Sequence, residues 1–199
     1  MNSSSPVVGV LSLQGDYQKH QAALDSIAVP SLAVRRAEDF DRIDRLIIPG
    51  GESTTIVKLL RRLEMETALI EFIRTRPVWG TCAGMVLLAD RVNDDSIKPY
   101  RAIDIAVDRN GYGRQIASTV IPSSLNLNGH REKLNLVFIR APRVTRVGSD
   151  VRKLLSYNDE PVLMSQGQVL VSSFHPELSA SSLLHNYFTR KFVLPETPR

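Results

Sequence analysis

The chain has 199 residues, of which 43% are hydrophobic, 23% charged and 6% aromatic, a length that predicts one domain with its own core. Its formal net charge of +4 comes from charges of both signs spread along the chain, which, with so few aromatic residues, argues against a nucleic-acid-binding surface. The single cysteine excludes an intramolecular disulfide and a C-x-x-C motif, and the four histidines show no H-E-x-x-H spacing, so we expect no metal site.

Short apolar runs alternate with helical patterns through the first half of the chain. Pro30 ends the first helical pattern, and Ser53 or Thr54 is the expected N-cap of the second. This alternation predicts an α/β fold with a doubly wound, mostly parallel sheet and helices on both faces. The expected strands are 7–13, 31–35, 45–49 and 77–79, and the expected helices are 16–28, 53–63, 66–74 and a buried one at 85–89.

The middle of the chain has an antiparallel pattern. Asn110-Gly111 lies between the β-rich runs 103–107 and 115–121 and is a hairpin signal, as is Asn128-Gly129 before residues 134–140. Together they predict a small antiparallel excursion around residues 103–140.

The last third returns to the main pattern. Runs at 161–165 and 169–174 predict a hairpin through Gly167, and residues 183–192 predict a closing helix. We therefore expect a single domain, 1–199, with a core of about residues 7–192.

Cys82 follows an apolar strand and precedes a helix, within the sequence GTCAG at 80–84. A lone free cysteine is most often a small buried apolar residue. Glycines two positions before and after it, however, permit the strained strand–turn–helix of a nucleophile elbow. The start of a helix favours a thiolate over a thiol, and the N–H of Ala83 is placed to stabilise an oxyanion.

His175-Pro176-Glu177 follows the last predicted strand. Residues i and i+2 of an extended segment point the same way, and Pro176 favours an extended His175, so we expect Glu177 beside the imidazole. Such a carboxylate fixes the tautomer of the ring and stabilises its charged form, as in a catalytic triad. Each residue alone is commonly a solvated surface group, whereas their combination with the elbow is much more specific.

Residues 49–55 read PGGESTT at the end of a predicted strand. A glycine turn followed by a helix cap accounts for this sequence, and a nucleotide site is weakened by the absence of a Walker lysine. The free N–H groups of Gly50 and Gly51 are available to complete an oxyanion hole opposite Cys82.

Together these segments resemble the class I, or triad, glutamine amidotransferases. GTCAG at 80–84 and HPE at 175–177 occur in many members of that family. The resemblance spans about residues 7–192 and implies a flavodoxin-like fold. Four motifs point to one branch, the glutaminase subunits of pyridoxal 5′-phosphate synthases: LQGD at 13–16, PGGEST at 49–54, RNGYGRQ at 109–115 and FIRAP at 138–142.

The resemblance also implies roles for individual residues. Cys82 is implied as the nucleophile, His175 as general base and acid, and Glu177 as its orienting partner, with the N–H groups of Gly51 and Ala83 as the oxyanion hole. Gln14 and Gly15 are implied to shape the oxyanion side and to meet the partner. The residues implied to bind glutamine are Gly50, Gly51, Glu52, Arg109, Ile139 and Arg140.

The expected reaction is hydrolysis of L-glutamine to glutamate and ammonia, without a cofactor. Nothing in the chain would use ammonia, so a partner must, and the resemblance implies the barrel-shaped synthase subunit in a heteromeric complex whose docking activates the glutaminase. Without an apolar run of about 18 residues, and with no signal-peptide pattern in the first six, we expect no membrane span and a cytoplasmic setting.

Three other functions are compatible with parts of this pattern. One is an amidotransferase of another pathway, such as histidine or anthranilate synthesis. Another is a binding subunit that keeps the fold without the chemistry. The third is a flavodoxin-like nucleotide binder.

Overall fold

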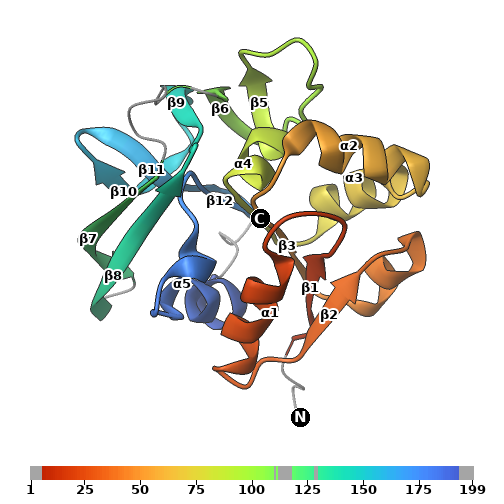
Figure 1. Ribbon diagram of the computed structural model, residues 1–199, viewed down its shortest axis with the longest axis horizontal. Coiled ribbons are helices and arrows are strands. Elements are labelled where there is room, and N and C mark those ends of the chain that lie inside the picture. The colour runs from red at the N-terminus through yellow and green to blue at the C-terminus, as the bar shows by residue number, and fades with distance from the viewer. Residues whose placement is uncertain (1–5, 110, 112–117, 128–129, 193–199) are drawn as a thin grey trace, which may run out of the picture.

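Five adjacent parallel strands and two antiparallel strands beside them form a seven-stranded sheet in the computed structural model (Figure 1), which describes residues 6–109, 111, 118–127 and 130–192. The sheet order is β10-β11-β12-β4-β3-β1-β2. Its parallel part is the flavodoxin-like order, so the predicted doubly wound sheet is confirmed. The parallel strands are β1 (Val8–Leu11), β2 (Ser31–Val34), β3 (Arg45–Ile48), β4 (Val78–Thr81) and β12 (Val169–Ser172), and the antiparallel edge is β11 (Glu160–Gln166) and β10 (Arg152–Tyr157).

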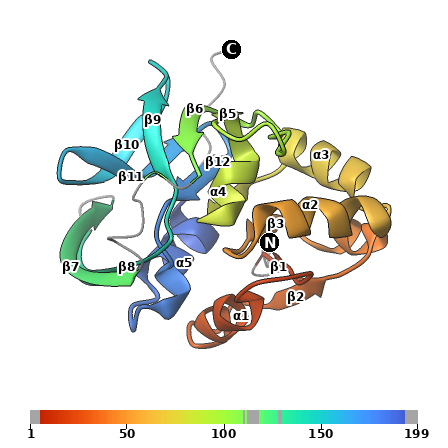
Figure 2. The ribbon, with the colours of Figure 1, turned by 45° about the horizontal axis from the view of Figure 1, so that its top comes forward.

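Successive residues of the central strands enter two apolar clusters on opposite faces of the sheet. Leu46 and Ile48 of β3 belong to the cluster that includes residues of α2, α3 and α4, whereas Ile47 between them belongs to the cluster with residues of α1 and α5. Figure 2 shows α2 and α1 on opposite sides of β1 and β3. Strands covered on both faces explain why these runs are almost wholly apolar. The helices are α1 (Tyr17–Asp25), α2 (Ser53–Arg62), α3 (Glu66–Thr75), α4 (Ala83–Leu88) and α5 (Leu183–Asn186), with a short 3₁₀ helix at Ala37–Arg42 and a π-helical turn at Tyr187–Lys191 after α5.

The expected cap of α2 is wrong by one residue. Glu52 is the N-cap, in an extended conformation, and it makes no capping hydrogen bond through its side chain. Its backbone N–H donates instead to the side-chain oxygen of Gln14 at 2.7 Å. This contact with the loop after β1 favours a helix start at Glu52. It could not be predicted from the sequence around Ser53 and Thr54, because Gln14 is distant in the chain.

The hairpin predicted through Asn110-Gly111 is also wrong. Among the described residues, strand β6 (Ile103–Asp108) pairs not with β7 (Ser118–Leu127) but with β5 (Ala89–Val92), parallel, and β9 (Arg143–Val147), antiparallel. Alternate residues of β6, beginning with Ile103, are buried in the cluster of α4. Burial against this cluster determines which strands pair with β6. The turn signal at Asn110-Gly111 is local and does not predict that burial.

The other two predicted hairpins are confirmed by their pairing. β7 runs antiparallel to β8 (His130–Ile139), and β11 runs antiparallel to β12 through Gly167, whose φ of +53° suits glycine. Asn110, residues 112–117 and the turn 128–129 lie outside the described residues, so the RNGYGRQ motif is described only in part. Within the described ranges, no helix is long and apolar enough to cross a membrane.

Candidate active site

Cys82 lies at a tight turn between β4 and α4. Its φ is +47° and its ψ is −102°, a region that residues other than glycine rarely occupy. A Cβ on Gly84 would overlap the carbonyl oxygen of Ile48, and one on Gly80 would come 2.5 Å from the carbonyl carbon of Gly84. The glycines therefore let α4 start directly against β3 and β4, and the predicted elbow geometry is confirmed.

Parallel pairing of β4 with β12 brings Cys82 and His175 to one edge of the sheet. The N–H of Cys82 donates to the carbonyl oxygen of Ser172, the last residue of β12, at 2.8 Å. His175 follows three residues later, and its own N–H donates to Val137 of β8 at 2.8 Å. The side chain of Cys82 is 7% exposed, and its sulfur lies 3.9 Å from the carbonyl oxygen of Ile139.

His175 and Glu177 contact each other as predicted, although the backbone reason given for it is wrong. Nδ1 of His175 lies 2.7 Å from Oε1 of Glu177, and both side chains are buried. Residues Pro176–Leu178 form a 3₁₀ turn rather than an extended segment. The turn, which begins at Pro176, curls the carboxylate back toward the ring.

The charges of this pair are set by burial and by their partners. Burial lowers the pKa of His175, but hydrogen bonds with Cys82 and Glu177 outweigh it and raise that pKa to about 10. Burial raises the pKa of Glu177, but His20 and the hydrogen bond with His175 bring it below its ordinary value. At neutral pH the site thus holds an imidazolium bonded to a carboxylate, in the cavity that Cys82 also lines.

The Gly50-Gly51 loop closes over this pair. A Cβ on Gly50 would overlap Cε1 of His175 and lie 3.3 Å from Cβ of Cys82. Gly15, with a φ of +91°, lies against the carbonyl of Gly50 so closely that a Cβ there would overlap its oxygen. Gln14 and Gly15 therefore contact the same loop that contacts His175.

A cavity of about 210 Å³ opens beside Cys82 and collects most of the residues singled out in the sequence. Ala83, the first residue of α4, has an N–H without an acceptor inside the helix. Asp16, Ser53, Val86 and Pro142 were not predicted to line it. The lining residues are Gln14, Asp16, Gly51, Glu52, Ser53, Cys82, Ala83, Val86, Arg109, Ile139, Arg140, Pro142 and His175.

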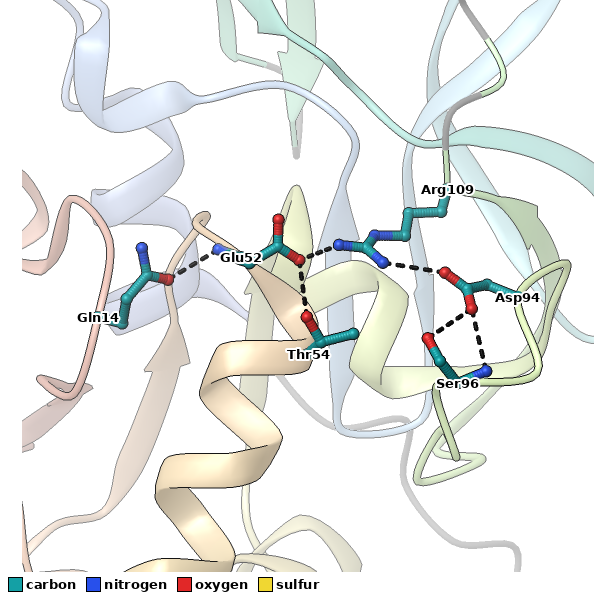
Figure 3. Close-up of polar contacts among 6 residues, drawn as sticks. All are labelled: Gln14, Glu52, Thr54, Asp94, Ser96 and Arg109. Carbon is teal, nitrogen blue, oxygen red and sulfur yellow. Dashed lines mark hydrogen bonds and ion pairs between the residues drawn. The ribbon is translucent and has the colours of Figure 1, made fainter.

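Arg109 is held in this cavity by two carboxylates (Figure 3). Its guanidinium pairs with Oε1 of Glu52 and, at 2.9 Å, with Oδ2 of Asp94. Thr54 donates to the same oxygen of Glu52 at 3.1 Å, while the N–H and hydroxyl of Ser96 bind Oδ1 of Asp94. The hydrogen bonds from Ser96 lower the pKa of Asp94. Sequence reasoning missed Asp94 and Ser96, because residues 93–100 match no motif.

One group of possible metal ligands exists among the described residues. Donor atoms of Asp16, His175 and Glu177 lie within 4.8 Å of one another. Because Nδ1 of His175 is already bonded to Glu177, a metal ion there would compete with that bond. The absence of a metal site stays a prediction.

Comparison with known proteins shows the family to which the chain belongs. A family model described as the SNO glutamine amidotransferase family matches residues 10–194. The pyridoxal 5′-phosphate synthase subunit PdxT of Francisella philomiragia is 47% identical over 181 residues, 91% of this chain and 96% of that protein. The protein of the same name from Solibacter usitatus is 45% identical over 189 residues, 92% and 98% of the two chains. A crystal structure described as a glutamine amidotransferase has 40% identity and a TM-score of 0.82, covering 91% of this chain and 96% of its own.

Proposed function

Because the chain belongs to the SNO glutamine amidotransferase family, we propose that it is the glutaminase subunit of a pyridoxal 5′-phosphate synthase, with Cys82, His175 and Glu177 as its catalytic triad. One observation carries the assignment of the triad. The buried imidazole of His175 is hydrogen-bonded to the carboxylate of Glu177, and the ring and the side chain of Cys82, at a strained elbow, line the same cavity and lie against the same glycine, Gly50. This arrangement activates a cysteine nucleophile.

The reaction proceeds in two steps. The thiolate of Cys82 attacks the amide carbon of the glutamine side chain, and the N–H groups of Ala83 and Gly51 stabilise the negative oxygen of the tetrahedral intermediate. His175 gives its proton to the departing nitrogen, which leaves as ammonia. The glutamyl group remains bound to Cys82 as a thioester. Water, deprotonated by His175, then cleaves the thioester to release glutamate and return the thiolate.

The cavity beside Cys82 has the charges that an amino acid requires. Arg109 is a partner for the α-carboxylate of glutamine and Glu52 for its α-ammonium group. Their mutual ion pair is exchanged for contacts with the bound zwitterion. Gly50 and Gly51 line one side of the substrate, and Ile139 with Arg140 line the other. All of these residues except Gly50 line one cavity, and Gly50 lies against His175 and Cys82 beside it, which supports this assignment.

The ammonia passes to the synthase subunit, which binds on the side of Gln14 and Gly15. A hydrogen bond supports this position for the partner, because the side-chain oxygen of Gln14 accepts from the N–H of Glu52, next to the Gly50-Gly51 loop. A partner that moves Gln14 therefore moves the Gly50-Gly51 loop, which is how docking activates the glutaminase. We extend the proposal to a single domain over the whole chain and to a cytoplasmic setting.

The test is glutamate formation from glutamine by the wild-type chain and by Cys82→Ala, each mixed with a pyridoxal 5′-phosphate synthase subunit. We expect strong stimulation of the wild type by that subunit and a loss of about 1,000-fold or more in Cys82→Ala, since removing a nucleophile leaves only binding and the oxyanion hole. Because the change removes one small buried atom, folding and complex formation should persist. Activity retained by Cys82→Ala rejects Cys82 as the nucleophile.

A further inference from the structure

Two further buried histidines lie behind the triad, and the mechanism above does not use them. His20 of α1 and His185 of α5 are each 0% exposed. Nδ1 of His20 lies 3.0 Å from Nε2 of His185, and both rings pack on the indole of Trp79, with ring centroids 5.8 and 5.1 Å away. Burial of two imidazoles at the junction of two helices costs free energy unless their nitrogens are used.

The other nitrogen of His20 faces the triad. Nε2 lies 3.3 Å from Oε2 of Glu177 and 3.4 Å from the hydroxyl of Thr81. Oε1 of Glu177 is engaged by His175, whereas the buried Oε2 has no hydrogen bond from the described residues. The 3.3 Å approach of His20 therefore lies at the one oxygen of this carboxylate that still needs a donor.

One order of protons fits the contacts of this row of side chains. If Nε2 of His20 carries a proton, which lies near both the hydroxyl of Thr81 and Oε2 of Glu177, its Nδ1 accepts from Nε2–H of His185. Nδ1 of His185 is then a bare acceptor, and it is the nitrogen without a partner in the described part of the chain. The reverse order would aim a lone pair of His20 at a carboxylate oxygen.

Both outer rings are neutral. Burial lowers the pKa of His20 despite the attraction of Glu177, and burial and His20 lower that of His185 well below its ordinary value. A neutral donor stabilises the carboxylate without competing with His175 for the charge-bearing proton.

We propose that His20, oriented by His185, is a positioning residue that holds Oε2 of Glu177 and so keeps Oε1 on Nδ1 of His175, an inference that rests on the proposed function of the triad. His20 touches neither substrate nor Cys82. It acts by fixing the orientation of the carboxylate that fixes the imidazole, so it supports the chemical step and leaves glutamine binding unchanged.

Two polar substitutions of similar bulk separate this role from simple packing. In His20→Gln the side-chain amide nitrogen takes the place of Nε2 and can donate to Glu177, whereas in His20→Asn the amide is too short to reach it. With the synthase subunit present, we expect kcat for glutamine hydrolysis to fall about 10-fold in His20→Asn, with KM unchanged, and to stay within about 3-fold of the wild type in His20→Gln.

Thr189→Val is the matched control. Thr189 is buried in the same helical segment as His185 and its hydroxyl donates to the carbonyl of His185, away from Glu177. This variant should keep the kcat of the wild type, and unfolding midpoints of all variants report whether they fold. Equal kcat in His20→Asn and the wild type, equal losses in His20→Asn and His20→Gln, or a change confined to KM overturns the inference. An inactive wild type would instead reject the proposed function.

Discussion

The charge of the individual histidines distinguishes His175, the proposed catalytic ring, from His20 and His185. The same fold raises the pKa of His175 to about 10, through Cys82 and Glu177, and lowers the pKa of His20 and His185, through burial. An ordinary histidine loses its proton near pH 6.5. Over the neutral range, His175 should therefore be charged, and His20 and His185 should both be neutral.

NMR of the ring nitrogens as a function of pH checks this expectation. The ring of His175 should stay protonated well above pH 6.5, while those of His20 and His185 should stay neutral down to below that pH. In Cys82→Ala, the midpoint of His175 should fall, because the hydrogen bond that raises its pKa most is removed. A wild-type His175 that titrates near pH 6.5, or one that Cys82→Ala does not change, contradicts the proposed coupling of ring and thiol.

How far single residues can be predicted from the sequence depends on where their partners are. Cys82 and the His175–Glu177 pair are visible because each motif is local, within five residues. His20 gives no such signal, since its partner His185 is 165 positions away and only the packing of α1 against α5 brings the two together. Asp94 is invisible for the same reason, because its contact with Arg109 is made by folding.

At the scale of elements, the start of α4 depends on close backbone contacts. Gly84→Ala should destabilise the protein by about 1–3 kcal/mol, as overpacking does, because the added Cβ meets the backbone of Ile48 rather than a side chain that can move. Gly167→Asn is the control, since that position is open and asparagine tolerates its positive φ. Urea unfolding compares the two. A Gly84→Ala protein as stable as the wild type would mean that α4 can shift away from β3.

The elements themselves follow from the sequence where burial is local. Apolar runs predict β1, β3 and β12, and the spacing of Ile56 and Leu60 predicts α2. The start of α2 could not be predicted, because the N–H of its N-cap, Glu52, is bound by a side chain of another loop. The partners of β6 could not be predicted either, because they depend on burial in a cluster formed by distant segments. Strand β10 was missed because it is an edge strand of largely exposed residues.

The whole molecule brings the candidate site together from segments distant in the chain. The loops after β1, β3, β4, β6, β8 and β12 all reach one edge of the fold, which is where an open α/β sheet binds its ligands. The sequence contains a nucleophile elbow and an HPE motif whose first residues of interest, Cys82 and His175, are 93 positions apart. They meet in one site because β4 and β12 are neighbouring strands.

The fate of the glutamine nitrogen tests this account most directly. The chain and a pyridoxal 5′-phosphate synthase subunit would be supplied with glutamine labelled with nitrogen-15 in its side-chain amide, in the presence of unlabelled ammonium. We expect pyridoxal 5′-phosphate enriched in the label beyond its share of the free ammonium pool, and no such enrichment with Cys82→Ala. A product whose nitrogen matches the free pool, or whose labelling does not depend on Cys82, would contradict the proposal that this chain generates and delivers the ammonia.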